Sequence, residues 1–142
     1  MKRTQTIFIL LLSIASLFSC TAQENKTSET NSVSNKIEVF YFHFTRRCMT
    51  CNAVESETNK ALTALYPTEI ESGKLVFKSV NLDEDTSEAD ATRCKASGQS
   101  LLIIYNGEKT DLTSIAFMNA SNKPEKLKAE IEKVIKPLLA LK

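Results

Sequence analysis

Two cysteines stand two residues apart in the stretch TRRCMTC, residues 45–51. A Cys-x-x-Cys pair occurs in redox-active sites, in metal sites and in structural disulfides, so the spacing of Cys48 and Cys51 leaves three chemistries open. Two arginines, Arg46 and Arg47, run directly into the first cysteine. The compartment that the chain reaches and the secondary structure around the pair decide between these chemistries.

The N-terminal segment Met1–Ser19 has the pattern of a secretory signal peptide, with a basic start and an apolar run from Ile7 to Leu17. That run is shorter than the roughly 20 apolar residues that a spanning helix needs. The segment closes on LFSC, which resembles a bacterial lipobox and implies that Cys20 is the lipidated first residue of the mature chain. The alternative is cleavage elsewhere, with Cys20 incidental. The lipobox reading predicts a protein of the cell envelope, lipid-anchored and facing the periplasm.

The rest of the chain divides into a polar segment and one domain. Residues 20–35 are almost free of large apolar side chains, which predicts a flexible tether. Residues 36–142 have the length of one small domain, and they contain no internal repeat. The whole chain has 18 basic and 17 acidic residues, and loss of Lys2 and Arg3 with the signal peptide would leave 16 basic residues. This near balance gives no electrostatic case for binding nucleic acid or an anionic membrane surface.

The cysteine pair is predicted to lie where a strand meets a helix. Ile37–Phe44 is almost continuously apolar and aromatic, as expected of a central strand buried on both faces. A helical pattern follows from about Cys48 to Tyr66, and Pro67 should stop it. The pair therefore falls on the first turn of a helix.

Further elements complete the order β-α-β-α-β-β-α. We expect a strand at Leu75–Leu82, followed by a short helix at Thr86–Lys95 that is capped by Asp85 or Thr86 and ended near Gly98. A strand at Leu101–Tyr105, a turn at Asn106-Gly107 and a returning strand at Thr110–Phe117 should form a hairpin. The last helix should begin at Ser121–Pro124 and be kinked or ended by Pro137. A strand reached through a crossover helix should pair in parallel, and the Asn-Gly hairpin should add an antiparallel edge.

This arrangement resembles the thioredoxin fold over the whole domain, residues 36–142. The resemblance rests on a buried strand, a Cys-x-x-Cys pair that opens a helix, a strand that ends in acidic residues, and the segment GQSLLIIYNGEK. It implies an α/β domain with a mixed four-stranded sheet flanked by helices. Within that superfamily the chain is most similar to exported Bacteroidetes-type proteins, some of them labelled nitrophenyl compound nitroreductase subunits.

The chain departs from the family pattern at the expected substrate-binding positions. The family's cis-proline, which faces the cysteines and helps to bind substrate, would fall at Ser100, where a trans bond is expected because a non-proline cis bond costs about 2.5–4 kcal/mol. Arg47 replaces the Trp that commonly precedes the first cysteine. These departures bear on substrate recognition more than on thiol chemistry.

Thiol–disulfide exchange requires a thiolate, and a helix N-terminus favours one through its free N–H groups and its dipole. We therefore predict that Cys48 is the nucleophile and that Cys51, one turn into the helix and shielded, is the resolving thiol. Arg46 and Arg47 either tune Cys48 or are solvated loop charges. A purely structural disulfide is the alternative, although closing so small a loop removes little chain entropy.

Two further functions remain open at this point. Cys48 and Cys51 could bind Cu(I), Zn²⁺ or arsenite with Cys94 or His43 as a third ligand. Alternatively, the loss of proline at Ser100 suits a non-catalytic partner-binding module. For Cys94 we favour a small buried apolar role over a third thiol near the pair, and for His43 a hydrogen-bonded strand histidine over a ligand. Under the preferred reading the partners are protein thiols or disulfides, with no cofactor and no resident metal.

Overall fold

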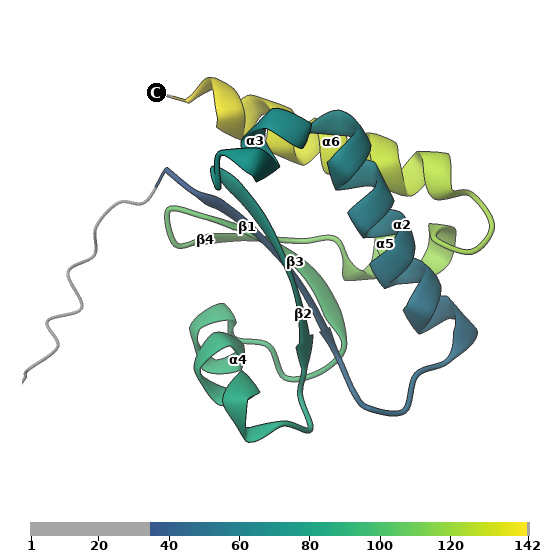
Figure 1. The fold of residues 1–142 in the computed structure, drawn as a ribbon. Helices are drawn as coiled ribbons and strands as arrows, with labels where there is room; N and C mark the ends of the chain where they lie inside the picture. The colour runs from purple at the N-terminus through teal and green to yellow at the C-terminus, as the bar shows by residue number, and fades with distance from the viewer. Residues whose placement is uncertain (1–34, 142) are drawn as a thin grey trace, which may run out of the picture. The chain divides into compact units, whose positions relative to one another are not determined.

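The computed structural model describes residues 35–141 of the chain (Figure 1). The predicted signal peptide, Cys20 and nearly all of the predicted tether lie outside the described residues. Within the part that is described, no helix combines the length and the apolar character that crossing a membrane requires.

A mixed four-stranded sheet forms the centre of the fold. Strand β1 (Ile37–His43) pairs in parallel with β2 (Leu75–Asn81) and antiparallel with β3 (Ser100–Tyr105). Strand β4 (Glu108–Asp111) pairs antiparallel with β3, which gives the spatial order β2-β1-β3-β4. The predicted α/β class, the parallel pair and the antiparallel edge are confirmed, and the topology is that of the thioredoxin fold.

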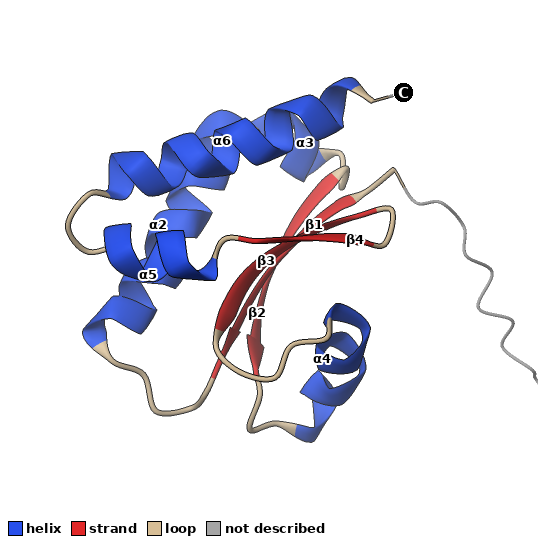
Figure 2. Ribbon diagram, turned by 180° about the vertical axis from the view of Figure 1, so that it is seen from behind, coloured by secondary structure: helices blue, strands red, loops and turns tan. Residues whose placement is uncertain are grey.

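Helices cover the two faces of this sheet unequally (Figures 1 and 2). One face carries α2 (Met49–Leu65), α5 (Thr113–Asn119) and α6 (Pro124–Ala140), while α4 (Glu88–Cys94), preceded by the 3₁₀ turn η1 (Asp85–Ser87), lies on the other. Successive side chains of a strand point to opposite faces. Val39 and Tyr41 of β1 therefore join the larger core under α2 and α6, and Phe40 and Phe42 join the smaller core under α4.

Helix α2 carries the cysteine pair and follows the predicted boundaries closely. It runs from Met49 to Leu65, with Cys48 and Tyr66 as its flanking cap residues. Val54, Ala61 and Leu62 form its buried stripe, which packs into the larger core. Pro67 ends the helix as predicted, and it also opens the short helix α3 (Pro67–Glu71), which was not predicted.

The hairpin turn is confirmed, but the strand predicted after it is too long. Asn106 and Gly107 both have positive φ, 50° and 82°, as the tight turn between β3 and β4 requires. Residues 110–117 were predicted as strand, whereas β4 ends at Asp111 and α5 begins at Thr113. Leu112, Ala116 and Ala120 are all buried at a spacing of four, which is the helical period.

The short helix predicted at Thr86–Lys95 is present as the turn η1 followed by α4, but its caps differ from those predicted. Neither Asp85 nor Thr86 caps it by a side-chain hydrogen bond. Its last residue is Cys94, and its C-cap Lys95 has a left-handed conformation with φ 50°, so the chain leaves the helix before Gly98. The Ala96 amide donates to the Ala91 carbonyl at 2.8 Å, which stabilises this termination without glycine.

The last helix begins with Pro124 in its first turn as predicted, although its cap residue, Lys123, makes no side-chain hydrogen bond. Helix α6 continues past Pro137 to Ala140, so Pro137 does not end it. Leu127, Ile131 and Ile135, spaced by four residues along one helix face, are fully buried.

Candidate redox site

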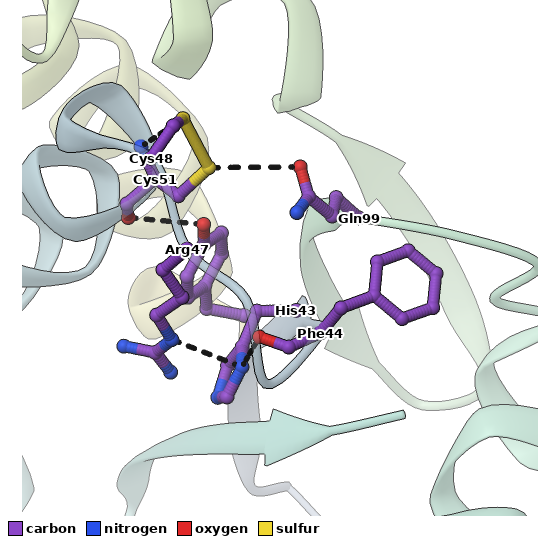
Figure 3. Close-up of a disulfide and its surroundings, with 7 residues drawn as sticks. His43, Phe44, Arg47, Cys48, Cys51 and Gln99 are labelled. Atoms are coloured by element: carbon purple, nitrogen blue, oxygen red, sulfur yellow. Dashed lines mark hydrogen bonds between the residues drawn. A yellow bond between two sulfur atoms is a disulfide. The ribbon is translucent and has the colours of Figure 1, made fainter. Parts of the chain in front are cut away.

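The two cysteines lie at the N-terminus of α2, in unequal surroundings (Figure 3). Cys48 is the N-cap residue and is exposed, and its Sγ accepts a hydrogen bond from the Cys51 amide at 3.2 Å. Cys51 is in the first turn and only 3% exposed. A disulfide joins them, with 5.2 Å between their Cα atoms. The accessible sulfur therefore belongs to Cys48, at the end of the helix where the dipole favours a negative charge.

Tyr41 on β1 is hydrogen-bonded to this first turn of α2. Its hydroxyl donates to the Cys51 carbonyl at 3.0 Å, and the side chain is fully buried. Burial raises the pKa of Tyr41 to about 12; the charge of Arg47 acts in the opposite direction and that of Glu55 adds to the rise. The phenol thus remains a neutral donor that ties the first turn of α2 to the sheet.

Arg47 does not turn toward Cys48 but toward the sheet and the next turns of α2. Its guanidinium forms an ion pair with Glu55, and a second nitrogen donates to Ser79 Oγ at 3.2 Å. Its Nε donates to His43 Nδ1 at 3.0 Å (Figure 3). None of the hydrogen bonds and ion pairs found within residues 35–141 joins Arg46 or Arg47 to Cys48, and Arg46 is exposed.

The Glu55 carboxylate is held in its charged form. Partial burial would raise the pKa of Glu55, but hydrogen bonds from Ser79 and Arg47 and the positive charge of Arg47 outweigh it, so that the pKa lies below its usual value. Glu55 follows Cys51 by four residues and so lies one turn farther along the same helix face. The Arg47–Glu55 pair therefore carries no net charge, and it lies about one helical turn beyond Cys51.

His43 is a buried, hydrogen-bonded strand histidine, the reading that the sequence favoured. It is 7% exposed, and its Nδ1 lies 3.0 Å from both Arg47 Nε and the Phe44 carbonyl. Arg47 Nε can only donate, so Nδ1 is the acceptor of the hydrogen bond from Arg47.

Cys94 lies away from the pair. It is the last residue of α4, 2% exposed, and it packs into the smaller core with Phe40 and Phe42, on the face of the sheet opposite to α2. Burial, the largest effect, raises the pKa of its thiol. Across residues 35–141 no three His, Cys, Asp or Glu side chains are grouped as a metal would require. The fold thus does not assemble the Cys48, Cys51 and Cys94 or His43 ligand set.

Gln99 approaches the pair just before β3, and Ser100 is the first residue of that strand. Ser100 pairs with Phe42, and its hydroxyl donates to the Gly98 carbonyl at 3.1 Å. The bond before Ser100 is trans, as expected, since the part of the chain described has no cis peptide. The side-chain amide of Gln99 lies 3.8 Å from Cys51 Sγ. Its oxygen can accept from the Cys51 thiol in the dithiol form, and its nitrogen can face the sulfur in the disulfide.

Sequence reasoning missed Tyr41, Glu55 and Gln99 as parts of this site. The spacing of four residues between Cys51 and Glu55 could have pointed to a shared helix face. Tyr41 and Gln99 carried no comparable local signal, because each reaches the pair only through strand pairing.

The surface next to Cys48 is partly apolar. Met49 is 89% exposed and Phe44 is 39% exposed, and Figure 3 shows the Phe44 ring turned away from Arg47. An exposed sulfur, a shielded partner and apolar neighbours suit a disulfide that exchanges with a thiol brought by another molecule.

Comparison with known proteins adds little to this picture. No family model and no curated protein matches the chain. It is similar to the crystal structure of Trxlp from Edwardsiella tarda EIB202, with 20% identity, a TM-score of 0.45, and coverage of 70% of this chain and 84% of that one. A second structure, titled as that of a malarial protein, is 19% identical with a TM-score of 0.37, and 58% of this chain and 93% of that chain are covered.

Proposed function

We propose that this protein is a thiol–disulfide oxidoreductase that is anchored to a membrane by a lipid on Cys20 and faces the periplasm. The observation that carries the redox part is the exposed Cys48 sulfur at the N-cap of α2, disulfide-bonded to the buried Cys51. Cys48 is the sulfur that exchanges with a partner, and Cys51 is the resolving or leaving sulfur.

The exchange begins from the disulfide. A partner thiolate attacks Cys48 Sγ, the bond between Cys48 and Cys51 breaks, and Cys51 leaves as a thiolate that takes up a proton. A second partner thiol then loses its proton and attacks the partner's sulfur in the mixed disulfide, so that Cys48 leaves as a thiolate that takes up a proton when it becomes a thiol. Two electrons and two protons pass from the partner dithiol to the protein, and the reverse sequence reduces a partner disulfide.

The helix end stabilises Cys48 as a leaving group and as a nucleophile. In the dithiol form its thiolate can keep the hydrogen bond from the Cys51 amide, and the α2 dipole adds to it. We assign substrate contact to Ser100, at the start of β3, and to the exposed side chains of Phe44 and Met49. The partners are protein thiols or disulfides. Arg46 is exposed and adds a positive charge to the surface that a partner would contact.

The Cys51→Ser variant tests the exchange. Its Cys48 can still attack a partner disulfide, but nothing resolves the adduct, so mixed disulfides with cell proteins should accumulate on non-reducing gels and vanish on reduction. Cys48→Ser is the matched control, since it keeps Cys51, Cys94 and Cys20 and should form no such adducts. Equal adduct formation by both variants, or by neither, would refute the proposal.

The membrane anchor is tested separately. Its support is the pattern of residues 1–20, which resembles a lipoprotein signal and lipobox. The wild-type protein should incorporate labelled palmitate and sediment with the membranes, whereas Cys20→Ser should do neither. If the wild type takes up no label, the anchor is wrong while the exchange chemistry is unaffected. We also propose a relation to the exported nitroreductase-subunit proteins, which is supported by the resemblance of residues 36–142 and not by the signal segment.

A further inference from the structure

Arg47 adjoins the reactive cysteine in sequence, yet its guanidinium is occupied elsewhere. One nitrogen pairs with Glu55 on α2, another donates to Ser79 on β2, and Nε donates to His43 on β1. The side chains of Arg47 and Glu55 are 21% and 29% exposed, so the pair is half-buried rather than solvated. One side chain thus joins the loop before Cys48 to three elements of the fold.

This ion pair lies close to the redox centre. The Arg47 guanidinium is 6.0 Å from the centre of the Tyr41 ring, and the Tyr41 hydroxyl is bonded to the Cys51 carbonyl. Glu55 is one helical turn from Cys51. A positive charge here without its partner would stabilise a thiolate at Cys48, and a negative charge alone would destabilise it.

We propose that Glu55 is a positioning residue of the redox site, which holds Arg47 against the sheet and cancels its charge at the cysteine pair. The N-terminus of α2, and not the arginine before Cys48, then determines how readily Cys48 ionises. Without Glu55 the disulfide would be a stronger oxidant. This inference rests on the proposed exchange function, and it adds the residue that tunes it.

The sign follows from the charge. Glu55→Gln keeps an oxygen that can accept from Arg47, but it leaves one uncompensated positive charge beside the pair. That charge stabilises the Cys48 thiolate, so the dithiol form gains relative to the disulfide and the reduction potential rises. Arg47→Gln leaves a negative charge and should shift the equilibrium in the opposite direction. The double variant restores neutrality.

Two measurements on the purified full chain test this. The first is the equilibrium constant of the Cys48–Cys51 pair in a glutathione redox buffer. The second is the pH dependence of iodoacetamide alkylation of Cys48, followed on its own peptide so that Cys20 and Cys94 do not interfere. An unpaired charge one helical turn from Cys51 should change both by about three- to tenfold. Raising the salt concentration should reduce the change, because the pair is partly exposed.

Matched variants separate charge from structure. Glu38→Gln is the control, since Glu38 also pairs with an arginine, Arg93, but on the face of the sheet that carries α4. It should leave the redox equilibrium within about twofold of the wild type. Arg47→Lys keeps the charge beside Glu55 and should also stay near the wild type. If Glu55→Gln proves unstable, the opposite shift of Arg47→Gln and the return toward the wild type in the double variant still decide the question.

The outcomes distinguish this inference from the proposed function. If Glu55→Gln and Arg47→Gln shift the equilibrium in the same direction, or no farther than Glu38→Gln, Glu55 does not act by cancelling charge and the inference is wrong. If the wild-type pair does not equilibrate with glutathione at all, the proposed exchange function fails first, and this inference fails with it.

Discussion

The Tyr41 hydroxyl should affect stability with opposite signs at neutral and at alkaline pH. Tyr41→Phe keeps the ring in the larger core and removes only the donor to the Cys51 carbonyl. That carbonyl is within α2, so it retains its hydrogen bond from the amide four residues on. The change therefore removes one buried hydrogen bond without creating an unpaired acceptor.

The loss at neutral pH follows from that single bond. A buried neutral hydrogen bond contributes about 0.5–1.5 kcal/mol, and no methyl or methylene group is removed from the core. For a domain of this size about 1 kcal/mol lowers Tm by about 5 °C. The oxidised Tyr41→Phe protein should therefore be slightly but measurably less stable than the wild type at pH 7.

At alkaline pH the wild type should become less stable than Tyr41→Phe. Burial, the dominant cause, raises the pKa of Tyr41 in the folded protein from 10.0 to about 12. The folded state therefore favours the neutral phenol, and the stability that depends on it is fully present below pH 10 and lost as pH rises through 12. Two pKa units correspond to at most about 2–3 kcal/mol. Tyr41→Phe has no such ionisation, so the two stability curves should cross between about pH 10 and 12.

Urea unfolding of the disulfide form from pH 7 to pH 11.5 measures this crossing. Tyr105→Phe is the control, because Tyr105 is also buried but no hydrogen bond of its hydroxyl is found within residues 35–141; it should cost less at pH 7. Curves for Tyr41→Phe and the wild type that stay parallel over the whole range would refute the reasoning, and so would equal stability at pH 7.

Other predictions concern the remaining thiol, acid stability and the core. In the reduced native protein iodoacetamide should modify Cys48 and leave Cys94 intact, because burial raises the pKa of the Cys94 thiol; peptide mapping reads this, and similar labelling rates would contradict it. The pKa values of Glu55 and Asp90 are lowered in the folded protein. The stability from their ion pairs is therefore present above the usual carboxyl pKa near 4, and it is lost as pH falls through the lowered values. Urea midpoints of the wild type should fall steeply below about pH 4, and those of Glu55→Gln and Asp90→Asn should fall less steeply. Ile131→Ala in α6 removes a fully buried side chain and should cost about 2–5 kcal/mol in urea unfolding, against under about 0.5 kcal/mol for an exposed lysine of the same helix changed to alanine.

The predictable parts of the fold are those governed by nearby residues. The apolar run of β1, the helical stripe of α2 and the positive φ of Asn106 and Gly107 each depend on a short stretch of chain, and each was predicted. The failure at residues 110–117 arose where two local patterns compete. A four-residue strand is followed almost directly by a helix there. The helix is favoured because it buries Leu112 and Ala116 in the larger core.

The sequence by itself determined that one cysteine would lie at the start of a helix and a second cysteine one turn farther on, because both follow from where a strand pattern stops and a helical one starts. Only the tertiary structure decided which groups meet them. The register of β1 with β2 places Tyr41 opposite Ser79, which puts the Ser79 hydroxyl within hydrogen-bond distance of Arg47. Pairing with β3 brings Gln99 to Cys51, and the alternation along β1 puts Cys94 under the other face. The contacts of Ser79 and Gln99 at this site depend on strand register, which brings together residues far apart in the chain.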